Sequence, residues 1–168
     1  WCKSNLGTKP CNQSNSRKSV MNIEQLREEL KVDEGVKYEI YLDHLGLPTC
    51  GIGHLITDQD PEHGLEVGTK VDEERVNELF DQDVEVTTNE CRLLYNNFDD
   101  LPEEVQRIIA NMMFNMGRPR LSRFHKMKQA VDSGDWSEAA AQMKDSRWYN
   151  QVTNRAQRLV DRMQNVTT

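Results

Sequence analysis

A change in hydrophobic pattern marks residues 31–55, which read KVDEGVKYEIYLDHLGLPTCGIGHL. Apolar and polar side chains alternate over residues 36–41, which is the pattern of a half-buried β-strand. The turn-forming sequence Asp43-His-Leu-Gly46 follows, and residues 47–53 return as a second short strand that contains two glycines. The stretch therefore predicts a small antiparallel sheet.

One short helix is expected before this sheet. Asn22 is a suitable N-cap, because its side chain can accept a hydrogen bond from the first turn, and Gly35 is a typical residue to end a helix. The apolar residues between them recur at helical spacing and are Ile23, Leu26 and Leu30. The folded part of the chain is therefore expected to begin with a helix that leads directly into the sheet.

The sequence after the sheet predicts helices. Asp72 is a suitable N-cap for a long helix that extends to about residue 91. Pro102 is expected at the first position of another helix over residues 103–116, because its missing N–H is not needed there. Gly117 is expected to end that helix.

Two more helices are expected near the C-terminus. Asp135-Trp-Ser-Glu138 has capping-box spacing, and Thr153 is expected to cap the last helix. The predicted fold class is α+β: a small sheet-containing N-terminal lobe, joined by a long helix to a larger all-helical C-terminal lobe, with a substrate cleft between the lobes. Within one domain of residues 21–168, these parts span about residues 21–71, 72–91 and 92–165.

The composition is that of a globular protein, and its charge is unevenly distributed. The 168 residues carry a net charge of −7, and residues 1–20 hold four basic side chains and no acidic ones, which leaves −11 on the rest. An acidic body argues against nucleic acid as the main partner, because phosphate contacts need clustered Lys and Arg. No apolar run approaches the roughly 20 residues of a membrane helix, so no membrane partner is expected, and a monomer is the default.

The cysteines and the start of the sequence bear on the cellular setting. The chain begins at Trp1 without an initiating Met, as a processed protein does, and its number of cysteines is even. These features favour a secreted, extracellular protein with disulfides, in which residues 1–20 form a polar extension tied down by cysteines. Three pairings are open, and four reduced thiols in an intracellular or virus-encoded protein are the alternative. The cysteines are Cys2, Cys11, Cys50 and Cys91.

Two acidic residues occupy positions suited to chemistry. Glu34 lies at the predicted end of the first helix, and Asp43 lies at the turn between the two strands. Hydrolysis of a glycosidic bond needs one carboxyl group that protonates the leaving oxygen and a second that manages water or the developing positive charge. The chain has 28 acidic residues, so this pair indicates little without the motif around it.

The residues around this pair resemble a known family. The segment from Asp33-Glu34-Gly35 through Thr49-Cys-Gly-Ile-Gly-His54-Leu55 is similar to the signature of the phage-type lysozymes, with its internal spacing intact. Residues 111–117 (NMMFNMG) and 146–156 (SRWYNQVTNRA) resemble two further blocks of that family, in the same order. The resemblance covers about residues 21–165. It implies a lysozyme-like fold and a hydrolase that cleaves the β-1,4 bond between N-acetylmuramic acid and N-acetylglucosamine in bacterial peptidoglycan.

The resemblance assigns catalytic roles to three residues. Glu34 would be the general acid, and Asp43 and Thr49 would hold the attacking water on the opposite face of the sugar, which gives inversion at the anomeric carbon. Arg155 would reach Glu34 from the helical lobe and fix its carboxyl group. The expected biological role is antibacterial defence or digestion.

Supporting and substrate-binding residues are implied as well. His54 would be a structural partner of Asp83 on the long helix rather than a catalytic base. For Phe114, which would bind substrate, packing in the hydrophobic core is the alternative interpretation. No metal or cofactor is expected, because the four histidines form no ligand spacing and no phosphate-binding loop is present. The expected substrate-binding residues are Leu55, Phe114, Asn115, Gln142 and Arg147.

Other classes of protein are compatible with parts of this pattern. A non-catalytic wall-binding module would not need Glu34, Asp43 and Thr49 together, and a lytic transglycosylase would leave an anhydro sugar product. A virus-encoded endolysin would share the chemistry and differ in location. The acidic charge is unlike this family, so we expect weak adhesion to anionic cell walls and activity that depends strongly on ionic strength.

Overall fold

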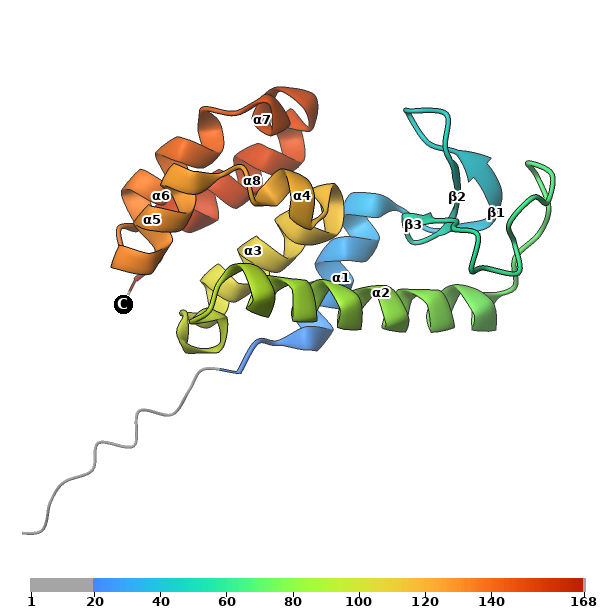
Figure 1. Ribbon diagram of the computed structural model, residues 1–168, viewed down its shortest axis with the longest axis horizontal. Helices are drawn as coiled ribbons and strands as arrows, with labels where there is room; N and C mark the ends of the chain where they lie inside the picture. Colours follow the sequence, from blue (N-terminus) through green and yellow to red (C-terminus); the bar gives the residue numbers. More distant parts are fainter. Residues whose placement is uncertain (1–19, 168) are drawn as a thin grey trace, which may run out of the picture.

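The computed structural model of the chain describes residues 20–167, in which one helix and a small sheet precede a series of helices (Figure 1). The first elements are α1 (Ile23–Glu34), β1 (Lys37–Leu42), β2 (Pro48–Gly51), β3 (His54–Leu55) and α2 (Glu73–Leu94). The 3-10 turn η1 (Phe98–Asp100) follows, and the remaining helices are α3 (Glu103–Met116), α4 (Arg118–Leu121), α5 (His125–Ser133), α6 (Trp136–Lys144), α7 (Arg147–Gln151) and α8 (Thr153–Gln164). The predicted α+β, lysozyme-like fold class is confirmed.

The sheet has three antiparallel strands in the order β1-β2-β3. Tyr41 pairs with Thr49 between the first two strands, and Cys50 pairs with His54 between the last two. The sequence predicted one strand over residues 47–53, but Gly51 and Gly53 adopt φ of 63° and 60°. This left-handed conformation turns the chain back on itself, and the third strand results.

Side-chain caps define the helix starts that the sequence predicted. Asn22 accepts a hydrogen bond from the Gln25 amide at 3.1 Å. Asp72 caps α2 by accepting from the Arg75 amide at 2.8 Å, and α2 continues three residues beyond the predicted end. Asp135 caps α6 in the same way. These local contacts satisfy amide groups that have no partner within the helix.

The prediction that Thr153 caps the last helix is wrong. Val152 is the N-cap of α8, and the Thr153 hydroxyl instead donates to the carbonyl of Asn150 at 3.3 Å. The reason is the short helix α7, which Ser146 caps and which ends next to α8. A single residue joins the two helices, so Thr153 already has helical geometry.

The sheet lies at one end of the molecule, and most of the helices gather at the other (Figure 1). In Figure 1 the long helix α2 runs past both the sheet and the remaining helices. Helix α1 comes first in the sequence but packs against α3, and β2 packs against α2. Leu26 and Leu30 of α1 are fully buried, as are Ile108 and Met112 of α3. Helix α1 is therefore anchored in the helical core, and its C-terminal end is delivered to the sheet.

A disulfide between the two cysteines of the described residues is not present, because Cys50 and Cys91 both carry free thiols. A Cβ at Gly51, next to Cys50, would lie 3.2 Å from Val76 near the start of α2. A helix rises about 1.5 Å per residue, so Cys91 is about 22 Å further along α2. A disulfide needs Cα atoms within about 7 Å.

Burial keeps the thiols of Cys50 and Cys91 protonated. Both cysteines are 0 % exposed, and loss of hydration raises the pKa of Cys50 to about 11 and that of Cys91 to about 12. The predicted extension with Cys2 and Cys11 lies outside the described residues. Within residues 20–167, no helix is long and apolar enough to cross a membrane.

Candidate active site

Glu34 is the last residue of α1, and its carboxyl group is held from the helical part of the chain. Arg155 of α8 donates from Nη1 to Glu34 Oε1 at 2.7 Å. The Glu34 side chain is 19 % exposed, so water or a ligand can still reach it. Among residues 20–167, no hydrogen-bond donor is assigned to Oε2, and one oxygen of Glu34 is therefore fixed while the other is available.

Gly53 explains why the sheet can approach this carboxyl group. A Cβ at Gly53 would lie 2.7 Å from Glu34 Oε2, closer than a real Cβ contact allows. Its φ of 60° also disfavours residues with side chains. The glycine thus supplies both the turn between β2 and β3 and the space for the Glu34 side chain.

Asp43 is oriented by the turn that follows β1. Its Oδ1 accepts hydrogen bonds from the backbone amides of Leu45 at 2.8 Å and Leu47 at 2.9 Å. Both interactions use the same oxygen, so Oδ2 is left to accept from a water or a substrate hydroxyl. The turn therefore fixes the plane of the carboxylate before any ligand arrives.

Thr49 lies on β2, beyond the same turn. Its side chain is buried, and Oγ1 donates to the carbonyl of Leu47 at 3.0 Å. Because the hydroxyl proton is used in this bond, the lone pairs of Oγ1 are free to accept a hydrogen bond from another group. The backbone of Leu47 thus hydrogen-bonds to the side chains of both Asp43 and Thr49, and it fixes the orientation of each relative to the other.

Tyr41 is a member of this site that the sequence did not identify. It pairs directly with Thr49 across the two strands, which places both side chains on one face of the sheet. Burial raises the pKa of Tyr41, and the nearby acidic groups Glu34 and Asp43 contribute in the same direction. The phenol therefore stays protonated, and Lys37 Nζ lies 4.2 Å from the centre of its ring.

Asp33 organises the arginine that holds Glu34. Its side chain is 2 % exposed and accepts from Arg158 Nη2 at 2.5 Å and from Asn111 Nδ2 at 2.9 Å. Asn111 in turn accepts from Arg155 Nε at 2.8 Å. The sequence quoted Asp33 and Asn111 only as parts of motifs, since their meeting depends on how α1, α3 and α8 pack.

His54 bridges two carboxylates away from this chemistry. Its Nδ1 lies 2.7 Å from Asp83 Oδ2 on α2, and its Nε2 lies 2.8 Å from Asp60 Oδ2. A neutral imidazole can donate to only one of them. Burial alone would lower the pKa of His54, but hydrogen bonds and charge from Asp83 and Asp60 outweigh it and raise the pKa. The expected contact with Asp83 is present, and Asp60 is a second partner that the sequence did not reveal.

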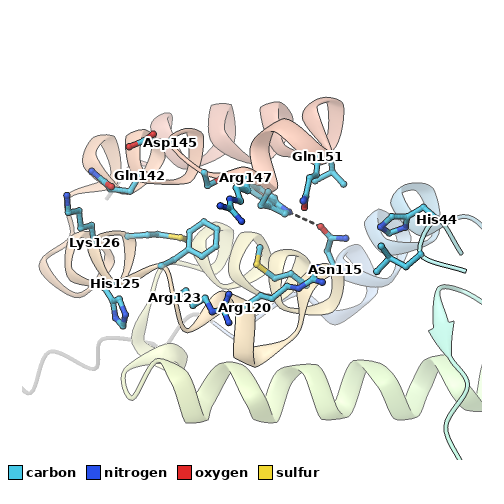
Figure 2. A pocket seen from close by; sticks show the side chains of 17 residues that line it. His44, Asn115, Arg120, Arg123, His125, Lys126, Gln142, Asp145, Arg147 and Gln151 are labelled. Carbon is cyan, nitrogen blue, oxygen red and sulfur yellow. Dashed lines mark hydrogen bonds between the residues drawn. The ribbon is translucent and has the colours of Figure 1, made fainter. Parts of the chain in front are cut away.

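A cavity of about 950 Å³ extends from the β1–β2 turn along the helical part of the chain. Three of the expected substrate-binding residues line it, namely Asn115, Gln142 and Arg147. Asn115 Oδ1 accepts from Trp148 Nε1 at 2.7 Å, as Figure 2 shows. His44, which follows Asp43 in the sequence, lines the same cavity, whereas Glu34, Asp43 and Thr49 are not among its lining residues.

The other two expected substrate-binding residues do not line this cavity. Phe114 packs edge-to-face on Phe80, with ring centres 6.1 Å apart, which agrees with its alternative role in the core. Leu55 of β3 is 48 % exposed on the sheet. Within residues 20–167, no group of three or more His, Cys, Asp or Glu side chains is arranged to hold a metal ion.

Together, the fold and the site define a two-lobed α+β protein with a carboxyl pair between a helix end and a sheet. A sequence model of the family Phage lysozyme matches residues 31–165. The chain belongs to this family.

Comparison with individual proteins agrees with this assignment. Probable T4-type lysozyme 2 of Dictyostelium discoideum is 31% identical over 160 residues, covering 82% of this chain and 92% of that protein. The pre-baseplate central spike protein Gp5 of Enterobacteria phage T4 is 28% identical over 80% of this chain and 26% of its own length. Peptidoglycan hydrolase gp36 of Pseudomonas phage phiKMV is 26% identical over 82% of this chain and 15% of its own length.

Proposed function

We propose that this protein is a peptidoglycan hydrolase that cleaves the β-1,4 bond between N-acetylmuramic acid and N-acetylglucosamine with inversion. The observation that carries the proposal is the division of labour between two carboxyl groups on different elements. Glu34 is held through one oxygen by Arg155. Asp43 is held through one oxygen by two backbone amides. Each group keeps one oxygen for the reaction.

Glu34 is the general acid in this mechanism. Its Oε2 carries the proton that passes to the glycosidic oxygen as the bond to the anomeric carbon breaks. The bond between Arg155 and Oε1 keeps the carboxyl group from rotating away from the leaving group. Asp33 and Asn111 support this arginine in turn, so their contribution is to position the acid.

Asp43 and Thr49 handle the water. The free Oδ2 of Asp43 and a lone pair of Thr49 Oγ1 each accept a hydrogen bond from a water between them, so this water presents its own lone pair to the anomeric carbon. Attack from the face opposite the leaving group inverts the configuration, as expected when water rather than a carboxylate is the nucleophile. The proton released from this water passes to Asp43, and the proton of Glu34 leaves with the departing sugar.

The similar proteins support the substrate that this proposal names, since one of them is called a peptidoglycan hydrolase and another a T4-type lysozyme. The biological setting we propose is secretion, with a role in antibacterial defence or digestion. A virus-encoded endolysin is the alternative, and the phage proteins among the similar sequences are compatible with it.

The proposal is tested by clearance of a purified peptidoglycan suspension by wild type and Glu34→Gln. The variant keeps the size of the side chain and loses the transferable proton, so we expect a loss of at least about 10²-fold. Glu28→Gln is the matched control, because Glu28 lies on the same helix and its side chain is 73 % exposed.

Equal clearance by wild type and Glu34→Gln would remove Glu34 from the role of acid. Binding to the wall without clearance by either protein would instead indicate a wall-binding module. Product analysis separates the remaining alternative, because hydrolysis leaves a reducing sugar of inverted configuration, and a transglycosylase leaves an anhydro sugar.

A further inference from the structure

The phenol of Tyr41 has no role in the mechanism proposed above, although its neighbours do. Asp43 follows it by two residues, and Thr49 pairs with it across β1 and β2. Among residues 20–167, no hydrogen-bond partner is assigned to the Tyr41 hydroxyl group. The buried side-chain atoms that lack a partner in this range are Trp136 Nε1 and Arg162 Nη2, so the Tyr41 hydroxyl group is open to solvent. It is a free hydrogen-bonding group beside the carboxyl pair.

Two contacts hold the ring of Tyr41 in place. The pairing with Thr49 puts both side chains on one face of the sheet. Lys37, four residues earlier on the same strand, places Nζ 4.2 Å from the centre of the ring, where a cation is attracted to the aromatic face. The residue is half-buried, so its ring has packed surroundings while the hydroxyl group stays accessible. The phenol is therefore oriented before a ligand arrives, which lowers the cost of a hydrogen bond to that ligand.

The phenol also shares its surroundings with both carboxyl groups. Glu34 and Asp43 act together with burial to raise the pKa of Tyr41, and such electrostatic effects require proximity. The neutral phenol is a hydrogen-bond donor. A sugar whose glycosidic bond breaks must contact Glu34 on the side of the leaving group and the water held by Asp43 on the other. This sugar and the Tyr41 hydroxyl group thus occupy the same part of the site.

The reaction restricts which oxygen of the sugar can accept from this donor. The glycosidic oxygen receives the proton of Glu34. The ring oxygen shares the positive charge of the oxocarbenium-like transition state, so a hydrogen bond donated to it would oppose the reaction. The exocyclic hydroxyl and acetamido oxygens carry no such charge. They remain as acceptors that a neutral phenol can bind without cost to the chemistry.

We propose that Tyr41 donates a hydrogen bond to an exocyclic oxygen of the sugar whose anomeric carbon is attacked, and is thereby a further catalytic residue. The inference rests on the proposed function, since it concerns the same sugar. The sugar ring flattens as the bond breaks, which moves its exocyclic oxygens, and hydrogen bonds to such groups strengthen in the transition state. A phenol fixed on a strand matches one geometry of the sugar, and we assign this geometry to the transition state.

The test compares Tyr41→Phe with Tyr38→Phe. The first variant removes the hydroxyl group and keeps the ring that Lys37 contacts. Tyr38 is a matched control, because it lies on the same strand and is 50 % exposed. The Tyr38 carbonyl accepts from the amide of Val71, on the opposite edge of β1 from β2. The midpoint of urea denaturation should be the same for both variants and wild type, which shows that both fold.

We expect Tyr41→Phe to lower kcat for purified peptidoglycan about tenfold, because one hydrogen bond to the transition state is lost. Its KM should stay within twofold of wild type, since the bond is weak in the ground state. The pH dependence of activity should keep its shape, because the contact is to the sugar and not to Glu34 or Asp43. Tyr38→Phe should match wild type in every assay.

Three outcomes of these assays would overturn the inference. Tyr41→Phe could retain the kcat and KM of wild type. It could raise KM alone, which would mean that the hydroxyl group makes no contact specific to the transition state. It could also shift the pH dependence of activity, which would assign the hydroxyl group to Glu34 or Asp43 rather than to the sugar.

A spectroscopic measurement separates this inference from the proposed catalytic function. Glu34→Gln is labelled with ¹³C at the Cζ atoms of its four tyrosines and titrated with a soluble, peptide-free tetrasaccharide of alternating N-acetylglucosamine and N-acetylmuramic acid. The Cζ resonance that is missing in Glu34→Gln/Tyr41→Phe belongs to Tyr41, and the resonance of Tyr38 is the internal control.

A shift of the Tyr41 resonance on addition of the glycan, with the Tyr38 resonance unchanged, supports the contact even if wild type shows no clearance of peptidoglycan. A Tyr41 resonance that stays unchanged with excess glycan contradicts the contact even if wild type clears the suspension.

Discussion

Two groups of arginines in this molecule have opposite surroundings. Where α1, α3 and α8 meet, Arg107 contacts Glu29, Glu103 and Glu104, and Arg162 contacts Glu29 and Glu104. This junction network of five residues is partly buried and sets two arginines against three glutamates. Four other basic residues line the cavity, are exposed and have no assigned carboxylate partner within residues 20–167, namely Arg120, Arg123, Lys126 and Arg147. The comparison teaches that arginines matched by acids hold the fold, whereas unmatched ones at a cavity are available to a ligand.

Arg107→Ala should give the largest effect on stability. The Arg107 side chain is 7 % exposed, and its removal leaves three carboxylates close together with one remaining arginine, Arg162, which contacts only two of them. We expect the free energy of unfolding to fall by about 3 kcal/mol, as when one partner of a buried pair is removed. Urea denaturation measures this change.

The control for this change is Arg92→Ala, which breaks the exposed pair with Asp99. It should cost less than about 1 kcal/mol. If the two variants were equally stable, the distinction between the junction network and ordinary surface pairs would fail.

Asp33→Asn should give the next largest effect. It removes the carboxylate that pairs with Arg158 and that accepts a hydrogen bond from Asn111. We expect a loss of about 2 kcal/mol in the free energy of unfolding, because a hydrogen-bonded charge inside the protein is removed. Because Glu34 is then held less firmly, kcat should fall about tenfold while KM stays within twofold. A KM that rises alongside an unchanged kcat would contradict a positioning role for Asp33.

The pH dependence of stability tests the pairing of protonated His54 with Asp60 and Asp83 in the small lobe. The pKa of His54 is raised in the folded protein, so the charged form stabilises the fold fully below the ordinary value of 6.5. This contribution is lost as the pH rises through the folded pKa. The free energy of unfolding of wild type should therefore decline above about pH 6.5, the usual pKa of histidine.

His54→Gln should be less stable than wild type at pH 6 and should lack this decline. Chemical denaturation at a series of pH values measures both. A decline of equal size in the variant would assign the pH dependence to other groups.

Arg123→Gln should give the smallest effect on stability. With no carboxylate partner assigned to Arg123 within residues 20–167, we expect the free energy of unfolding to stay within about 0.5 kcal/mol of wild type. A large loss of stability would mean that Arg123 has a structural role, and it would weaken the contrast with the junction network.

Much of the fold could be predicted because its signals are local. The caps at Asn22, Asp72 and Asp135 depend on side chains that reach amides three residues away. The turn at Asp43 acts over a similarly short distance, whereas the turn at Gly51 and Gly53 was predicted as part of a single strand. Thr153 was misassigned because a preceding short helix, which shows no clear hydrophobic period, decided where α8 begins.

The candidate site could be predicted only in part. Glu34, Asp43 and Thr49 belong to one stretch of sequence, so a motif could identify them, although their catalytic roles await the variants described above. The contact between Arg155 and Glu34 spans 121 positions and was expected from resemblance alone. Tyr41 and Asp60 were missed, since their meaning depends on strand register and on how the loop before α2 folds back to His54.

By itself, the sequence determined the α+β arrangement, the starts of α1, α2, α3 and α6, the turn between β1 and β2, and the family. These features follow from hydrophobic period, caps and glycine, which act between near neighbours. The tertiary structure alone decided which charges are matched. Seven arginines found carboxylates, many of them on distant elements, while three others were left lining a cavity. Electrostatic pairing depends on distances in space, and sequence spacing does not contain these distances.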